Sequence, residues 1–509
     1  MSTIIMITQL ILGLAILVFV HELGHFLAAR LFHIRVPKFY LFFNPTFSLV
    51  RMKRINGKWV VKFFAKNLPD TEIEVDESGK PIKDENGKIK HKLIDTASLP
   101  DDDWRKYPEN TEYGIGWLPL GGYCQIAGMI DETQSMSNLA SEPQPWEYRS
   151  KPAWQRLIVI LAGVFVNMIV SVFLFALVLY HYDKKYLPLD AVTNGIYAFE
   201  AARDMGFQTG DKIISIDGKK YERFQDAVSP KLFFGSIVTV ERNGQLVDIV
   251  ITDEAYNIMK TNANKFILPI NFPAKIDSIT ENGKADIAGL KSGDIIIALD
   301  TNIVENTVIA TDSNLKQERK MPTPDFTFGT LIEYRSNYAN KLTTITFIRQ
   351  NDTLTTNILL DSTALVDILI FNKYYETKSY TIGQSFKYGW SDAFGNIWLN
   401  IKGLGKIFSG EESAKSLSGP IGIAQIYGTS WIWERFWYIT ALLSAILAFM
   451  NILPIPGLDG GHALFTIVEM LTGKKVSDNV LQYAQTIGMI ILLLLMIFVI
   501  GNDIFKLFG

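Results

Sequence analysis

Four long apolar runs constrain this chain of 509 residues more strongly than any other feature of its sequence. They cover residues 4–20 (extending through a polar patch to residue 31), 157–180, 437–450 with the apolar stretch after it, and 487–500. A helix needs about 20 apolar residues to cross the hydrocarbon core of a bilayer. The sequence therefore predicts a polytopic α-helical membrane protein with about four transmembrane helices and both termini on the same side.

Basic residues predict the orientation of these helices. Lysine and arginine are frequent just after the first run and just before the second, whereas the other side carries chiefly Lys184, Lys185 and Lys506. Because positively charged loops tend to stay in the cytoplasm, we expect residues 31–156 there and residues 183–430 outside. A cleaved signal peptide fits the first run poorly, since no basic residue precedes the run and no small-residue cleavage site follows it.

Charge and cysteine content exclude several classes of protein. The formal charge of -3 is nearly neutral, which argues against a nucleic-acid partner. The single cysteine, Cys124, excludes both an intrachain disulfide and a cysteine-based zinc site. Residues 67–112 form a charged insertion rich in Asp, Lys and Gly, which predicts a surface hairpin around residues 84–87. We assign no chemistry to this insertion.

The region expected outside the cytoplasm contains an internal repeat. Residues 205–218 and 288–300 each hold a glycine with a hydrophobic neighbour, a Gly-Asp turn and an apolar strand that ends in aspartate. The pattern resembles the core of a PDZ domain, which typically binds an extended peptide as an added strand. Peptide-binding grooves and mere steric bulk over the membrane both stay open as interpretations. Residues 380–427 have apolar residues at helical spacing, which fits a helix on the membrane surface or an ordinary core stripe.

The sequence His-Glu-Leu-Gly-His at residues 21–25 carries the strongest chemical signal, and it lies within the first apolar run. On a helix, residues four apart project from one face, so His21 and His25 can reach one metal ion. Glu22 is placed beside them and can act as a base on a water at that metal. Two hydrogen-bonded core histidines are the structural alternative. Ionisable side chains are costly within a membrane span, however, and they favour a functional site.

A catalytic zinc ion usually takes three protein ligands and a water molecule, so a third ligand must come from elsewhere in the chain. Residues 451–462 read Asn-Ile-Leu-Pro-Ile-Pro-Gly-Leu-Asp-Gly-Gly-His, with Asp459 as a lone carboxylate in apolar sequence. The prolines and glycines interrupt the helix, which is tolerated at membrane depth beside protein or a water-filled cavity. His462 lies three residues further on and could share the same face. Spacing alone therefore leaves Asp459 and His462 as candidates.

Together these motifs resemble the site-2 protease family, the intramembrane zinc metalloproteases of peptidase family M50. The resemblance rests on His-Glu-Leu-Gly-His in the first run, Leu-Asp-Gly-Gly-His in a late segment and the PDZ-like repeats between them. Supporting segments are 161–163 with Asn167, 418–423 and 451–454. The arrangement is closest to the bacterial regulator of sigma-E protease type, which has tandem PDZ domains. The insertion at 67–112 is the main departure.

The resemblance implies a zinc metalloendopeptidase whose metal ligands are His21, His25 and Asp459 and whose general base is Glu22. It implies regulated cleavage of single-span membrane proteins in the bacterial inner membrane, with anti-sigma-factor-like regulators or signal-peptide remnants as substrates. The PDZ-like domains are then expected on the periplasmic side, with peptides as potential ligands. The rival interpretation is a membrane-anchored PDZ scaffold or receptor with a vestigial or structural metal site. The family also associates residues matching Asn451 and Pro454 with substrate handling.

Residues 113–129 are apolar and glycine-rich but too short for a membrane span. They resemble the family's re-entrant β loop, whose edge could hold a substrate as an added strand. The substrate would have to unwind, because the amides of a transmembrane helix are hydrogen-bonded internally. This interpretation makes Gly116, Gly121 and Gly122 candidate substrate contacts. A buried cytoplasmic hairpin is the alternative.

These features predict a fixed order of domains along the chain. The expected ranges are 1–33 for the first transmembrane helix, 34–153 for the cytoplasmic β-rich re-entrant region with its insertion, 154–182 for the second transmembrane helix, 183–262 and 263–365 for two PDZ-like α/β domains, 366–430 for amphipathic membrane-proximal helices, 431–473 for the third transmembrane segment, and 474–509 for the fourth transmembrane helix.

Overall fold

The structure is a computed structural model of the chain, and it divides into two compact units. Met1–Asp183 and Thr381–Gly509 form the first unit, and Lys184–Tyr380 form the second. The residues that the structure describes are 2–68, 71–73, 81, 91–94, 96–119, 121–129, 143–228, 236–251, 266–299, 326–360, 368–370, 375–410, 413 and 417–508.

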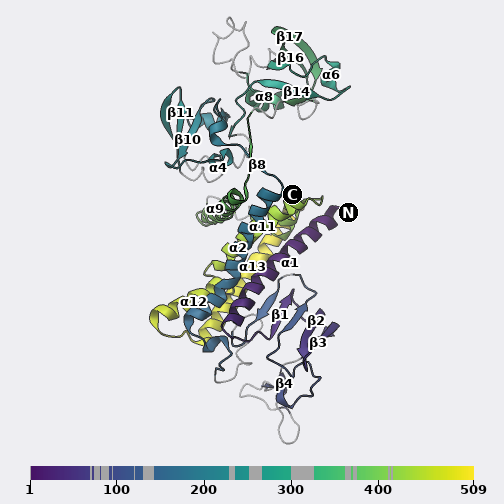
Figure 1. The fold of residues 1–509 in the computed structure, drawn as a ribbon, viewed down its shortest axis with the longest axis vertical. Helices are drawn as coiled ribbons and strands as arrows, with labels where there is room; N and C mark the ends of the chain where they lie inside the picture. Colours follow the sequence, from purple (N-terminus) through teal and green to yellow (C-terminus); the bar gives the residue numbers. More distant parts are fainter. Residues whose placement is uncertain are drawn as a thin grey trace. The chain divides into compact units, whose positions relative to one another are not determined.

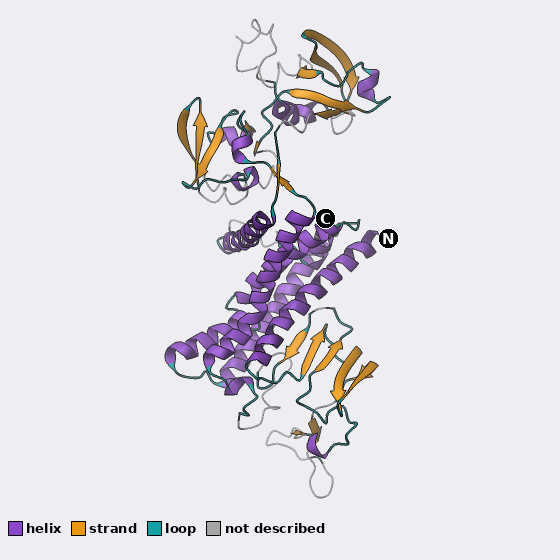
Figure 2. Ribbon diagram, in the orientation of Figure 1, coloured by secondary structure: helices purple, strands orange, loops and turns teal. Residues whose placement is uncertain are grey.

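The first unit contains a bundle of long helices, which lie side by side in Figures 1 and 2. The main members are α1 (Ser2–Leu31), α2 (Ala153–His181), α11 (Trp433–Ile452) and α13 (Asp478–Phe508). Each of these four contains a stretch long and apolar enough to cross a membrane, which confirms the prediction of about four such helices. The start of α1 and the end of α13 lie at the same end of the bundle (Figure 1).

Helix α2 lies at the centre of the bundle and packs against α1, α11, α12 (Asp459–Thr472) and α9 (Ile382–Phe408). Its contact with α11 includes two buried hydroxyl groups that donate to backbone carbonyls across the interface. Ser171 Oγ donates to Ala441 O at 2.8 Å, and Ser444 Oγ donates to Asn167 O at 2.7 Å. Such bonds are a common means of joining helices in lipid, where hydrophobic burial gives little driving force between them.

Helix α9 is amphipathic, as the sequence indicates. It begins with a capping box in which Thr381 and Gln384 exchange side-chain and backbone hydrogen bonds. One face buries Ser385, Tyr388 and Ala393, while the other exposes a row of aromatic side chains: Phe386, Trp390, Phe394 and Trp398. The shorter α10 (Pro420–Tyr427) follows it.

A five-stranded sheet packs against α1 in the first unit, with strand order β3-β2-β6-β1-β7. The strands are β1 (Lys38–Leu41), β2 (Phe47–Ile55), β3 (Lys58–Lys66), β6 (Glu112–Ile115) and β7 (Tyr123–Gln125). Strands β6 and β7 both pair with β1, β6 in parallel and β7 antiparallel, so the alternative of a hairpin over residues 113–129 is wrong. Strand β7 instead forms an edge of the sheet.

Part of the insertion also forms strands. Strands β4 (Thr71–Ile73) and β5 (His91–Leu93) pair antiparallel. The predicted turn at residues 84–87 lies outside the described residues.

The second unit contains both copies of the repeat, each in its own sheet. The first copy contributes to the sheet of β10 (Lys212–Ile216), β11 (Ile237–Arg242) and β12 (Gln245–Val250). The second contributes to the sheet of β14 (Ala274–Ile279), β15 (Ile295–Leu299), β16 (Leu342–Arg349), β17 (Asp352–Leu359) and β18 (Ile368–Ile370). The remaining elements are β8 (Lys185–Tyr186), β9 (Tyr197–Ala198), β13 (Ile267–Leu268), β19 (Lys378–Ser379), α3 (Glu200–Asp204), α4 (Phe224–Ala227), α6 (Lys284–Ile287) and α8 (Phe328–Tyr334).

The aspartate of each Gly-Asp turn has the same structural role in both copies. Asp211 and Asp294 are each 1% exposed. Arg242 donates to both carboxylate oxygens of Asp211 at 2.7 Å and to Gly206 O. Arg349 binds Asp294 in the same bidentate way and donates to Gly289 O. The repeat in sequence is therefore a repeat in structure, fixed by an arginine that joins the turn to the strand beside it.

Replacing Asp211 with alanine should loosen the first copy and leave the second unchanged. The change removes the partner of Arg242, whose side chain is 20% exposed and can regain water. We therefore expect a loss of about 2 kcal/mol, below the cost of an unpaired charge that stays fully buried. Hydrogen exchange of the β10–β12 amides in the full chain should accelerate about 30-fold. The amides of β14–β16 serve as the internal control, and equal acceleration in both sheets would contradict the assignment.

Candidate metal centre

His21 and His25 lie on the continuous helix α1, so their rings project from one face. Asp459 is the first residue of α12. The loop between α11 and α12 folds tightly against the start of α12, and only glycine fits there. A Cβ on Gly460 would lie 2.2 Å from Leu453 O, and one on Gly461 would lie 2.6 Å from Ile455 O. The Gly-Gly pair thus allows the loop to present Asp459 to α1.

The three side chains meet with nearly equal spacing. His21 Nε2 lies 3.2 Å from His25 Nε2, and Asp459 Oδ2 lies 3.2 Å from His21 Nε2 and 3.5 Å from His25 Nε2. Ligands bonded to zinc at 2.0–2.1 Å in a tetrahedron are about 3.3 Å apart. The three atoms therefore match one face of such a tetrahedron, and the fourth corner is left for water or substrate.

A second observation also indicates that this set of donor atoms fits a zinc ion. Asp459 Oδ2 is buried and makes no hydrogen bond of ordinary geometry, although two imidazole nitrogens lie near it. A buried carboxylate oxygen without a bond is costly, and a cation between the three groups removes that cost. Within the described residues, these three side chains are the one group of histidines, cysteines and acids close enough to hold a metal.

Both ring nitrogens that point away from this centre have partners on α2. His25 Nδ1 lies 2.8 Å from Val159 O, and a carbonyl can only accept, so Nδ1 donates and Nε2 is free for a metal. His21 Nδ1 lies 3.3 Å from the amide of Asn167. With its oxygen turned to His21, that amide accepts the imidazole proton.

Gly163 allows α2 to approach the two histidines. A Cβ at this position would lie 2.4 Å from His25 Nε2 and 2.7 Å from His21 Cε1. Gly24 faces it from α1, where a Cβ would lie 2.9 Å from the Gly163 Cα. Any larger residue at 163 would displace the imidazoles from the spacing described above.

A cavity of 290 Å³ opens at this centre and receives residues from the helices and the sheet. Asn451 lies at its wall, with Nδ2 3.3 Å from His21 Nε2. Gly121 and Gly122 line the cavity just before β7, whereas Gly116 and Pro454 are not among its lining residues. A Cβ on Gly116 would meet Phe43 O at 2.2 Å, so this glycine is needed for packing within the sheet.

The geometry at the cavity also distinguishes between Asp459 and His462, which spacing alone left as candidates for the third ligand. His462 lines the wall, but it is not one of the three residues whose ligand atoms converge. Asp459 belongs to this converging group, so the geometry favours Asp459 as the third ligand. The roles of Asn451, Pro454 and the three glycines in substrate handling remain predictions.

Sequence reasoning missed four contributors to this site: Val159, Gly163, Asn167 and Gln485. Gly163 and Asn167 were part of the family resemblance but had no role, and Gln485 on α13 lines the cavity. Polar side chains inside apolar runs are costly and suggest function, so Asn167 could have been found that way, whereas Gln485 lies just before the run at 487–500. A backbone carbonyl and a missing Cβ leave no such signal in the sequence.

The spacing of the three candidate ligands, the glutamate beside them and the membrane-capable helices are typical of membrane-embedded zinc metalloproteases. Comparison with known proteins agrees. The model of Peptidase family M50 matches residues 9–65 and 103–495, so the chain belongs to that family. The gap between the two matched blocks contains most of the insertion at 67–112.

The relatives of this chain carry protease names. It is 26% identical to "Regulator of sigma E protease" of Haemophilus influenzae, with 98% of each chain covered. It is 24% identical to "Putative zinc metalloprotease NMA0084" of Neisseria meningitidis, again with 98% of each covered. The chain is therefore a zinc metalloprotease of family M50, and the interpretation as a PDZ scaffold with a vestigial site is set aside.

Replacing Asn167 with alanine should weaken zinc binding by about 10- to 100-fold, because the bond that orients His21 is lost. Zinc affinity of the purified chain can be measured by competition with a chromophoric chelator. Ser171→Ala is the matched control, since Ser171 lies one turn further on α2 and bonds to Ala441 O instead. An equal loss of affinity in both variants would indicate damage to helix packing and not to His21.

Proposed function

We propose that this protein cuts single-span membrane proteins within or at the edge of the bilayer. The observation that carries the proposal is the convergence of His21 and His25, on the membrane-capable helix α1, with Asp459 at the start of α12, beside a cavity. The substrates we propose are regulators of the anti-sigma-factor kind or remnants of signal peptides. The relative named "Regulator of sigma E protease" supports the first of these.

In the proposed mechanism Glu22 is the general base. When bound, zinc supplies Lewis-acid chemistry, which acidifies water and polarises the scissile carbonyl. Glu22 takes a proton from the attacking water and passes it to the leaving amine. The amide of Asn451, close to His21 Nε2, is placed to donate to the oxyanion that develops on the carbonyl.

The edge of the five-stranded sheet is the proposed docking place for the unwound substrate. Strand β7 ends the sheet, and the glycines before it line the cavity at the metal centre. When the substrate helix unwinds, its backbone amides lose their hydrogen bonds within the helix. An extended peptide added beside β7 would replace them with hydrogen bonds to that strand. A Cβ on Gly121 would lie 2.9 Å from Phe43 Cε2 and one on Gly122 would lie 2.6 Å from Tyr40 O, so both glycines allow the segment before β7 to pack closely at the cavity.

Proline scanning tests the docking role of this edge. Single proline replacements along residues 121–127 should lower cleavage about tenfold or more, since proline lacks the amide hydrogen that a β ladder requires. Zinc content should stay at one ion per chain. Cys124→Ala, which keeps the amide hydrogen of β7, provides the control. Cleavage that is unchanged by the scan would contradict docking on β7.

We further propose that the chain crosses the bacterial inner membrane four times, with the β-sheet in the cytoplasm. The uneven distribution of lysine and arginine supports this orientation. It places the second unit on the periplasmic side, where its two repeats act as PDZ-like domains. Peptide binding in their grooves and steric exclusion of bulky substrates both remain compatible with this placement.

Reconstitution in liposomes tests the proposed function directly. Purified, zinc-loaded protein is mixed with a single-span peptide whose apolar segment contains helix-breaking residues, and the products are weighed by mass spectrometry. We expect cuts within the apolar segment or at its border, and a slower reaction with an all-leucine segment that cannot unwind. Cuts confined to the soluble flanks would contradict proteolysis in the membrane.

A further inference from the structure

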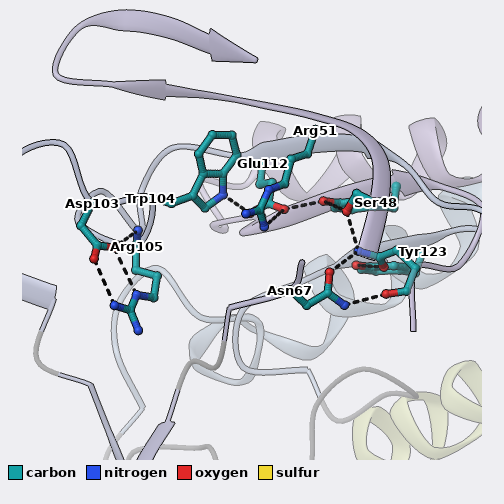
Figure 3. Close-up of polar contacts among 10 residues, drawn as sticks. Ser48, Arg51, Asn67, Asp103, Trp104, Arg105, Glu112 and Tyr123 are labelled. Carbon is teal, nitrogen blue, oxygen red and sulfur yellow. Dashed lines mark hydrogen bonds and ion pairs between the residues drawn. The ribbon is translucent and has the colours of Figure 1, made fainter. Parts of the chain in front are cut away.

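The sequence assigns no chemistry to the insertion at 67–112, yet both of its ends are bound into the five-stranded sheet. Figure 3 shows these polar contacts, with Asn67 and Trp104 approaching from the insertion and Glu112 and Tyr123 lying on the strands. Glu112 is 6% exposed and Trp104 is 3% exposed. The charged composition of the insertion gives no sign of these two anchoring points, of which the one at Trp104 and Glu112 is buried and the one at Asn67 is partly buried.

The first anchoring point is the carboxylate of Glu112 at the start of β6. Trp104 Nε1 donates to its Oε2 at 2.5 Å, and the Tyr40 hydroxyl donates to its Oε1. Arg51 Nη1 lies 3.8 Å from the same oxygen, and its guanidinium lies 4.6 Å from the centre of the Trp104 ring. A buried carboxylate is stable only with such partners. Glu112 therefore fixes the end of the insertion against β1 and β2.

Tyr40 links Glu112 to strand β7 at the edge of the sheet. Its ring stacks on Tyr123 of β7, with the centroids 5.2 Å apart and the planes 5° from parallel. Its hydroxyl also contacts Ser48 Oγ at 3.0 Å. Burial, and then the charge of Glu112, raise the pKa of Tyr40. The hydroxyl therefore stays protonated and can donate at all working pH values.

The second anchoring point reaches the same residue of β7. Asn67 Nδ2 donates to Asn44 O at 2.6 Å, and Asn44 Nδ2 lies 3.3 Å from Asn67 Oδ1. The Tyr123 hydroxyl donates to Asn44 Oδ1 at 2.9 Å. Both ends of the insertion thus converge on Tyr123, one through Tyr40 and the other through Asn44.

Strand β7 in turn contacts the proposed base. Glu22 accepts a hydrogen bond from the backbone amide of Cys124, the residue after Tyr123. Cys124 also lines the cavity at the metal centre. A shift of β7 would therefore move a hydrogen-bond donor of the group that must take and return the proton.

We infer that the ends of the insertion position β7, and through the Cys124 amide they position Glu22 for proton transfer. Trp104, Glu112 and Tyr40 are then positioning residues that lie outside the membrane-capable helices. The inference rests on the proposed role of Glu22 as the base. Small displacements of a catalytic group can lower a rate by about 100-fold, so this support can matter without touching substrate or metal.

The single cysteine of the chain makes the inference testable, because Cys124 is buried in β7 and reports its position. Alkylation of Cys124 by N-ethylmaleimide is timed in the zinc-loaded full chain, and kcat and KM are measured on a single-span peptide. Glu112→Ala removes the acceptor of Trp104 and Tyr40, while Glu112→Gln keeps one acceptor oxygen for Trp104 and places an NH2 group that can donate to the Tyr40 hydroxyl oxygen. Trp104→Phe is a milder second variant that keeps an aromatic side chain, although a smaller one, and removes the N–H donor.

We expect Glu112→Ala to speed alkylation at least about tenfold and to lower kcat about 10- to 100-fold. KM should stay within about twofold, and zinc should remain at one ion per chain. Glu112→Gln should restore both readouts to within about threefold of the parent, and Trp104→Phe should fall between the two. Tyr186→Phe is the matched control, since it removes a buried tyrosine bond to a glutamate, Glu222, in the second unit.

Three outcomes would overturn the inference. The first is unchanged alkylation in both Glu112→Ala and Trp104→Phe. The second is faster alkylation with an unchanged kcat, which would leave β7 loosened but Glu22 unaffected. The third is loss of zinc in step with activity, which would indicate general damage. The alkylation rate does not depend on proteolysis, so failure of the proposed function is recognised separately by a parent protein that does not cut.

Discussion

Replacing Glu22 with glutamine should abolish measurable peptide cleavage while the protein still binds one zinc ion. Glutamine has nearly the size of glutamate but cannot take a proton, and a positioned base contributes about 10²- to 10⁴-fold to such reactions. The three ligand atoms come from other residues and keep their spacing of 3.2–3.5 Å. Cleavage of a fluorogenic single-span peptide and metal content by mass spectrometry give the two readouts.

The control for this variant is Glu281→Gln, a change at a solvent-exposed glutamate of the second unit. It should leave cleavage unchanged. Residual cleavage above about a tenth of the parent rate in Glu22→Gln would contradict the role of Glu22. Loss of zinc in this variant would instead show that Glu22 helps to hold the metal.

Replacing Asp459 with alanine should weaken zinc binding by more than about 100-fold, beyond the usual effect of a residue that only orients a ligand. The variant leaves two imidazoles, and removes the oxygen that lies 3.2 Å from His21 Nε2. Cleavage should disappear at zinc concentrations that saturate the parent. Equilibrium dialysis against buffered zinc measures the affinity.

His462→Ala is the informative comparison, because spacing alone made His462 an equal candidate. It lines the cavity but lies outside the converging group, so zinc affinity should change by less than about threefold. Loss of zinc in His462→Ala with retention in Asp459→Ala would reverse the assignment of the third ligand.

The sequence predicted the parts of the site that depend on local spacing. Two histidines four residues apart on an apolar helix define a metal-binding face through the helical repeat alone. The third ligand was different, because spacing alone left both Asp459 and His462 as candidates. Only the place of the start of α12 in the fold distinguishes the two residues. The four membrane-capable helices were predicted for a similar reason, because length and hydropathy are local properties.

The sheet was predicted less well. The parallel pairing of β1 with β6 joins Lys38 to Glu112 across the whole insertion. Nothing in a short window of sequence specifies such a long-range register. The buried contact of Trp104 with Glu112, which are only eight residues apart, was missed for a different reason, because the charged residues around them indicated a solvent-exposed segment.

The positions of the proposed metal ligands along the sequence also determine when the enzyme can become active during biosynthesis. His25 leaves the ribosome roughly 430 residues before Asp459, which at a typical synthesis rate of about 5–20 residues per second is a delay of tens of seconds. Throughout that interval the nascent chain holds two imidazoles and a glutamate but no carboxylate to complete the centre. On the proposed ligand set, the catalytic centre is completed only when Asp459 has been synthesised, so cleavage cannot begin before then.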